Sequence, residues 1–116
     1  MLVKGERPRV LQSTTEKIGT GCGNLYITIG HNEDNKPIEV FATLGKAGGC
    51  SQCQNEALTR AITLGLRSGI PVESYIKELK GLECPSKKMW PENERVLSCP
   101  DGIARALEAF IGNDKK

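Results

Sequence analysis

The stretch Gly45-Lys46-Ala47-Gly48-Gly49-Cys50-Ser51-Gln52-Cys53 decides how we expect this chain to fold. Its glycines predict a tight turn, and the turn delivers a Cys-x-x-Cys pair into the start of an amphipathic helix. Three further cysteines lie elsewhere in the chain, at Cys22, Cys84 and Cys99. We therefore expect the domain to fold around a metal ion that is held by thiolates from these separate segments.

Two segments of alternating apolar and polar residues precede this turn. Residues 24–30 place Leu25, Ile27 and Ile29 on one side, and residues 38–44 resume the same period after a polar loop. Two such runs around a polar loop predict an antiparallel hairpin with one buried face. Lys17-Ile18 is expected to pair with an edge of this sheet, whereas residues 1–15 are expected to form a loose arm.

Three helices are predicted after the turn. The first covers about residues 53–68, the second runs from Pro71 to Gly81, and the third runs from Ser98 to Gly112 before a ragged end. The order of sheet first and helices afterwards predicts a single α+β domain over residues 1–116. In this fold a small antiparallel sheet, made of the hairpin and an N-terminal strand, is covered on one face by the three helices.

Composition limits the cellular compartments and the classes of partner that we expect for the protein. The 116 residues carry a net charge of +2 with both signs interspersed, which implies no strong nucleic-acid or membrane footprint, so we expect neither as a partner. No apolar run approaches the ~20 residues that a membrane helix needs, and the first thirty residues lack the core of a signal peptide. Five cysteines is an odd number, which argues against a secreted disulfide framework. We expect a cytoplasmic protein with reduced thiols.

The spacing of the cysteines does not decide which four of them bind a metal. Cys50, Cys53, Cys84 and Cys99 would make one closed set and leave Cys22 free; Cys22, Cys50 and Cys99 with Cys53 or Cys84 would make another. Cys50 and Cys99 lie at predicted helix starts, where the helix dipole favours a thiolate. Zinc is the favoured cofactor, and an iron–sulfur cluster is the alternative. A Cys-x-x-Cys pair at a helix start also fits thiol exchange.

Two other residues are candidates for chemistry. Asp101 follows Pro100 in a predicted first helical turn, and a carboxylate there favours the helix dipole without any catalytic role. His31 lies in a polar loop, which indicates a solvated histidine in preference to a metal ligand.

The segment Leu97-Ser98-Cys99-Pro100-Asp101 resembles the Thr-Ser-Cys-Pro-Asp signature of the TSCPD domain family. The resemblance extends over about residues 10–111 and departs from the signature at Leu97. The resemblance also rests on four other stretches of the sequence, which are Thr20-Gly21-Cys22-Gly23-Asn24-Leu25-Tyr26, Phe41-Ala42-Thr43-Leu44-Gly45-Lys46-Ala47-Gly48-Gly49-Cys50, Leu66-Arg67-Ser68-Gly69 and Leu79-Lys80-Gly81-Leu82-Glu83-Cys84-Pro85.

The family is best known as a C-terminal domain of adenosylcobalamin-dependent (class II) ribonucleotide reductases, and it also occurs as small free-standing proteins. The resemblance therefore implies an accessory or interaction domain without catalysis of its own. Its implied partner is a class II ribonucleotide reductase core or another protein. The large catalytic barrel, with its cobalamin and nucleotide sites, is not expected within these 116 residues, and the oligomeric state is left open.

The order of segments is also similar to that of the NifU-type iron–sulfur scaffold proteins. In that layout, a cysteine before the hairpin, one before a helix and one before the last helix converge on a zinc or cluster site. The similarity implies Cys22, Cys50 and Cys99 as a central trio, with Cys53 and Cys84 as extra ligands or neighbours. This similarity also implies an alternative function for the chain, that of an iron–sulfur cluster scaffold or thiol-redox carrier.

Overall fold

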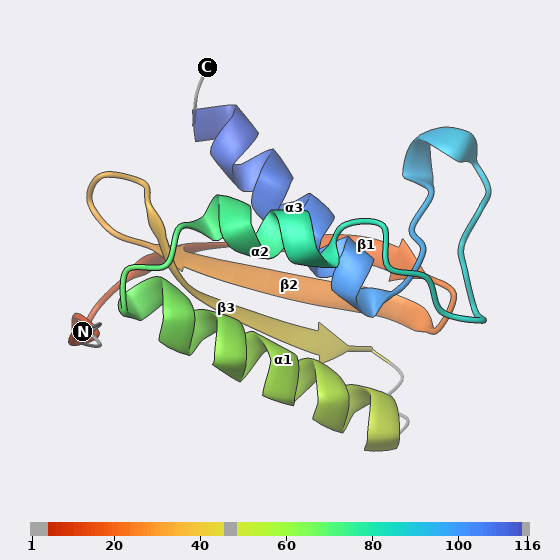
Figure 1. Ribbon diagram of the computed structural model, residues 1–116, viewed down its shortest axis with the longest axis horizontal. Helices are drawn as coiled ribbons and strands as arrows, with labels where there is room; N and C mark the ends of the chain where they lie inside the picture. The colour runs from red at the N-terminus through yellow and green to blue at the C-terminus, as the bar shows by residue number, and fades with distance from the viewer. Residues whose placement is uncertain (1–4, 46–48, 115–116) are drawn as a thin grey trace.

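A computed structural model of the chain describes residues 5–45 and 49–114. Three strands come first and three helices follow, so the predicted α+β class is confirmed (Figure 1). The elements are β1 (Gln12–Thr20), β2 (Gly23–His31), β3 (Pro37–Leu44), α1 (Gly49–Arg67), α2 (Val72–Leu79), the short 3-10 helix η1 (Glu92–Glu94) and α3 (Cys99–Asp114). Lys46, Ala47 and Gly48 of the predicted glycine turn lie outside the described residues.

The sheet has the order β1-β2-β3, and both pairs of neighbouring strands are antiparallel. Only Gly21 and Cys22 separate β1 from β2, so these strands form a tight hairpin. The N-terminal segment pairs with β2 over nine residues, from Gln12 to Thr20, and not at Lys17-Ile18 alone. Strand β1 therefore begins inside the segment that was predicted to be a loose arm.

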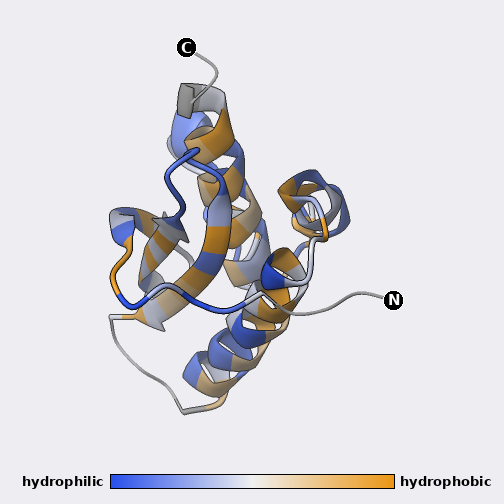
Figure 2. Ribbon diagram, turned by 90° about the vertical axis from the view of Figure 1, so that its left-hand side faces the viewer, coloured by the Kyte–Doolittle hydropathy of each residue, from blue (hydrophilic) through white to orange (hydrophobic). Residues whose placement is uncertain are grey.

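The hydrophobic core lies between the sheet and the three helices, all of which cover the same face (Figure 1). Bands of apolar and polar residues alternate along the strands and helices (Figure 2), as expected of elements with one buried face. Leu25, Ile27 and Ile29 are buried as predicted, and Ile62, Ile103 and Leu107 of the helices pack onto them.

The opposite face of the sheet is left uncovered by the helices. Tyr26 and Phe41 on that face are 39% and 50% exposed. Glu39 shares the face but is only 5% exposed, because Arg7 of the N-terminal segment covers it. The Arg7 Nε donates to Glu39 Oε1 at 2.7 Å, and the backbone N–H of Gly5 donates to the carbonyl of Arg67 at 2.6 Å. The arm is thus tied to the domain from residue 5 onward.

Helix α1 begins at Gly49, earlier than predicted, and turns a partly polar stripe toward β3. By helical spacing, Ala57 and Ala61 belong to the apolar stripe with Ile62 and Leu66, which predicts that they are buried. Both are exposed, whereas Asn55 and Thr59 are buried. The sequence pattern missed this because Thr59 satisfies its hydroxyl within its own helix, at the carbonyl of Asn55, and because the same side of α1 runs along the free edge of β3.

Two hydrogen-bonding side chains of α1 cap this edge. The Thr63 Oγ1 accepts from the N–H of Val40 at 3.0 Å and donates to its carbonyl at 3.1 Å. The Gln52 Oε1 accepts from the N–H of Leu44 at 2.8 Å. The backbone groups of an edge strand, which otherwise template aggregation or pairing, are thereby satisfied inside the domain.

Within residues 5–45 and 49–114, no helix combines the length and the apolar character needed to cross a membrane.

Candidate thiol site at one end of the sheet

Cys22 lies in the two-residue turn that joins β1 to β2. The turn is held by Thr20, whose Oγ1 accepts from the N–H of Cys22 at 3.1 Å and donates to the carbonyl of Gly23 at 2.7 Å. Its neighbour Gly21 touches the loop after α2: a Cβ built on Gly21 would lie 1.5 Å from the carbonyl oxygen of Ser86. Because no side chain fits there, glycine is required to let the Cys22 turn approach this loop.

Cys84 lies at the base of that loop, which connects α2 to α3. The N–H of Cys84 donates to the carbonyl of Leu97 at 3.0 Å, and Lys88 and Val96 exchange two backbone hydrogen bonds of 2.8 Å. The loop therefore folds back on itself like a short hairpin, which brings Cys84 beside the residues that open α3. Cys84 is half-buried there.

Cys99 is the first residue of α3 and is only 8% exposed. The helix is capped by the preceding residue: the Ser98 Oγ accepts from the N–H of Asp101 at 3.0 Å. The same oxygen donates to the carbonyl of Leu82 at 2.8 Å. Cys99 thus lies at the helix start, as predicted, but it does not cap the helix: Ser98 supplies the capping oxygen and leaves the sulfur of Cys99 free.

Asp101 is fully buried and fixes both ends of the loop that carries Cys84. Its Oδ1 accepts from the N–H of Gly81 at 2.8 Å, and its Oδ2 accepts from the N–H of Leu97 at 3.0 Å and from the Arg105 Nε at 2.7 Å. Burial alone would raise the pKa of Asp101, but these three donors outweigh burial and hold its pKa below the ordinary value. The predicted role, a favourable charge at the helix dipole, missed this bracing function.

The three segments bring Cys22, Cys84 and Cys99 together at one end of the sheet. The Cys22 thiol neighbours both other thiols: its pKa is raised first by partial burial and then by Cys99 and Cys84. All three are free cysteines. No spacing rule in the sequence could have singled out this trio, since it depends on the Gly21–Ser86 contact and on the bracing by Asp101.

The other two cysteines, Cys50 and Cys53, lie on the first turns of α1 and are exposed. The N–H of Gly45, at the end of β3, donates to the carbonyl of Asn24 at 2.8 Å, so the segment leading to α1 starts beside the Cys22 turn. Among the described residues no three His, Cys, Asp or Glu side chains form a ready metal centre. The trio is therefore a convergence of thiols, and the four-ligand sets predicted from the sequence stay predictions.

His31 lies at the other end of β2, away from the Cys22 turn. Its ring packs against Phe110 with 5.3 Å between ring centroids, and the residue is half-buried. The predicted solvated histidine is thus a packed one, because α3 extends over the end of the strand that carries it.

The donor set of this site suits a soft or borderline metal ion. Three sulfur atoms from three segments match the thiolate ligands of structural zinc and of iron–sulfur clusters. The residues around the cysteines are fixed by backbone hydrogen bonds of Cys84 and by the Ser98 cap, so the sulfurs are presented by an ordered frame. The three thiols are thus ligands of the right chemical kind for such a metal, although in residues 5–45 and 49–114 they are not arranged as a ready metal centre.

A one-sided α+β sheet with cysteines of three segments gathered at one end defines a small thiol-rich domain. The chain belongs to the TSCPD domain family, whose model matches residues 3–111. It is 30% identical over 70 residues to a vitamin B12-dependent ribonucleotide reductase of Agrobacterium fabrum, which covers 60% of this chain and 6% of the reductase. It is 25% identical over 107 residues to the enzyme of the same name from Streptomyces clavuligerus, covering 90% of this chain and 11% of the reductase.

This chain thus spans about a tenth or less of the length of these reductases. No solved structure matches it.

Proposed function

We propose that this TSCPD domain is a zinc-binding accessory module, without catalysis of its own, that serves a vitamin B12-dependent ribonucleotide reductase core. The observation that carries the metal proposal is the meeting of Cys22, Cys84 and Cys99, which come from a strand turn, a loop and a helix start. Structural metal sites typically gather sulfur ligands from separate segments of the chain.

The proposed ligands are Cys22, Cys84 and Cys99, with Cys50 or Cys53 as the fourth. Five peptide units separate Gly45, which is bonded to Asn24, from Cys50. Chain length alone therefore keeps Cys50 within roughly 18 Å of this end of the sheet. Bound zinc would supply a cross-link between the hairpin and the helical layer, and structural zinc contributes about 10–16 kcal/mol of apparent binding free energy.

Metal content and stability of the purified chain test this proposal. We expect one zinc per chain after purification under reducing conditions, and a large loss of stability to urea when a chelator removes it. Cys22→Ser, Cys84→Ser and Cys99→Ser should each lose the metal. A protein with substoichiometric zinc and iron, whose unfolding is unchanged by chelators, would remove the basis for the proposal.

The partner proposal is supported by the similarity to the two reductases, because 90% of this chain matches one of them. A reductase core from which the matching region has been deleted is the natural probe. We expect this chain to co-elute with that core in size-exclusion chromatography and to show no nucleotide reduction alone. Separate elution of the two at micromolar concentration, with unchanged turnover of the core, would refute the partnership.

The exposed pair Cys50 and Cys53 favours a second candidate, an iron–sulfur scaffold or thiol carrier, because an accessible dithiol is what thiol exchange needs. Anaerobic reconstitution with iron and sulfide separates the two functions. Visible absorbance that disappears in Cys22→Ala, Cys50→Ala and Cys99→Ala variants would support the scaffold, and a colourless zinc protein would exclude it.

A further inference from the structure

The two edge strands of the sheet, β3 and β1, differ in whether side chains of the domain bind their outward backbone groups. Along β3, Thr63 and Gln52 occupy the backbone groups of Val40 and Leu44. Along β1, the first six residues, 12–17, are exposed. In the part of the chain that the structure describes, no side chain caps the backbone of residues 12–18.

The register of the hairpin tells which backbone groups of β1 are free. Thr20 and Gly23 close a two-residue turn, and such a closing pair is hydrogen-bonded. Hydrogen-bonded and non-hydrogen-bonded pairs alternate along an antiparallel ladder. The N–H and C=O groups of Ser13, Thr15 and Lys17 therefore point away from β2, toward the open edge. The same alternation, continued across β2, places Val40 and Leu44 at the outer edge of β3, where their hydrogen bonds to α1 are found.

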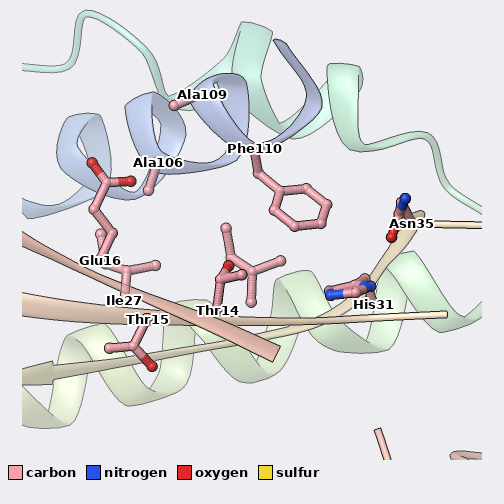
Figure 3. A pocket seen from close by; sticks show the side chains of 10 residues that line it. Thr14, Thr15, Glu16, Ile27, His31, Asn35, Ala106, Ala109 and Phe110 are labelled. Carbon is pink, nitrogen blue, oxygen red and sulfur yellow. The ribbon is translucent and has the colours of Figure 1, made fainter. Parts of the chain in front are cut away.

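A groove runs beside this edge on the helical side of the sheet. It has a volume of about 400 Å³. Its lining includes Thr14 and Glu16 of β1, Ile27 and Ile29 of β2, and Ala106, Ala109 and Phe110 of α3. Figure 3 shows Phe110 pointing from α3 into the groove and Glu16 standing near Ala106.

The C-terminal half of α3 runs past β1, beyond the edge of the sheet (Figure 1). The helix therefore overhangs a place where the sheet has no strand. A strand at that place would lie about 4.8 Å from β1, and α3 would cover its inward side chains with Ala109, which is exposed, and Phe110, which is half-buried.

We propose that the edge of β1 binds an extended segment of a partner polypeptide as a fourth strand, which pairs with Ser13, Thr15 and Lys17 and packs under α3. Main-chain pairing supplies affinity in this mode, and alternate side chains supply specificity. The proposed binding surface is the edge of β1 at residues 13–17, whereas the proposed metal ligands lie beyond the other end of this strand. The proposal therefore does not depend on metal binding.

Charge indicates what the partner strand carries. Among the residues that line the groove, Glu16 is the one with a formal charge at neutral pH, taking His31 as neutral. A lysine or arginine of the partner strand that faces Glu16 forms a favourable cross-strand pair. A second copy of this chain lacks this complementarity, because the residues of β1 that share the face of Glu16 (Gln12, Thr14, Ile18 and Thr20) include no basic side chain to set against it. We therefore commit to a strand with inward apolar residues and one inward basic residue.

A synthetic peptide tests the proposal. The probe is Thr-Val-Thr-Lys-Thr-Val-Thr-Val with blocked ends, titrated into isotopically labelled protein. We expect slowed amide hydrogen exchange at Ser13, Thr15 and Lys17, whereas Thr14 and Glu16 are protected without peptide. Two backbone-methylated peptides give the geometric control, since methyl groups on one alternate set of peptide nitrogens should abolish binding and those on the other set should not.

A charge swap gives the specificity control. Glu16→Lys should weaken the peptide roughly 5-fold, and a peptide with glutamate in place of lysine should recover the loss. Glu78→Lys on the exposed side of α2 is the matched variant and should change nothing. Equal binding of both methylated peptides would overturn strand addition in favour of simple groove filling. The same amides could instead become protected without peptide when the protein concentration is raised, with a doubled mass in light scattering. That result would show that a second copy of this chain, and not a partner strand, binds the edge of β1.

Discussion

Replacing Asp101 by asparagine should destabilise the domain strongly, although the side chain keeps its size. An asparagine has one acceptor oxygen where the carboxylate has two. If that oxygen takes the place of Oδ2, it still accepts from Leu97 and Arg105, but the amide NH₂ then faces the N–H of Gly81. If the amide is flipped, the donors from Leu97 and Arg105 lose their acceptor.

The magnitude follows from the better of these two arrangements. One buried N–H without an acceptor costs about 1–3 kcal/mol. The two remaining hydrogen bonds change from charged to neutral, which costs about 0.5–1 kcal/mol each. The sum is about 2–5 kcal/mol, a large share of the 5–15 kcal/mol typical of a domain. At about 4 °C per kcal/mol, the melting temperature should fall by roughly 8–20 °C.

Urea unfolding followed by circular dichroism, in metal-free and zinc-loaded protein, measures this change. Asp34→Asn is the matched control, because Asp34 is exposed in the turn between β2 and β3 and should change the free energy of unfolding by less than about 0.5 kcal/mol. If Asp101→Asn unfolds at the same urea concentration as this control in both forms, the bracing role of Asp101 is wrong.

Three further substitutions test the frame around the site and the sheet. Gly21→Ala should cost at least about 2 kcal/mol in unfolding free energy, because its Cβ would meet the carbonyl of Ser86; wild-type stability would show that the turn does not touch this loop. Gly112→Ala, in open space on α3, should instead stabilise the protein by about 0.5–1 kcal/mol, and a loss of melting temperature would contradict its helical, unobstructed setting. Thr63→Val keeps the shape but removes both hydrogen bonds to Val40, so it should cost about 2 kcal/mol by denaturant unfolding, whereas Thr63→Ser should cost less than half of that; equal costs for the two would argue against edge capping.

The sequence was sufficient to predict the class of fold. Period-two alternation predicted the two strands in residues 24–30 and 38–44, and helical spacing predicted the three helices. All five elements were confirmed, although Ala57 and Ala61 of α1 are exposed. Strand β1 was harder to predict, because its first six residues are exposed and carry no apolar alternation. Its pairing is specified by the two-residue turn at Gly21-Cys22 and by its partner strand, which are features of the folded chain.

The candidate site was only partly accessible to sequence reasoning. Every cysteine is a candidate metal ligand by its residue type. Which cysteines lie together depends on contacts between distant segments, such as the approach of Gly21 to Ser86. Asp101 was interpreted through its own helix, whereas its partners Gly81 and Leu97 lie outside that helix. Local patterns cannot report such contacts, since the same residues at the same spacing would satisfy a purely local role.

The most direct test of the central claim is a crystal structure of the zinc-loaded protein with anomalous data collected on both sides of the zinc absorption edge. The thiol site predicts one strong anomalous peak per chain, bonded to Cys22, Cys84 and Cys99 at about 2.3 Å. A chain without a peak at these three sulfurs, or with zinc bound only at Cys50 and Cys53, would contradict the account.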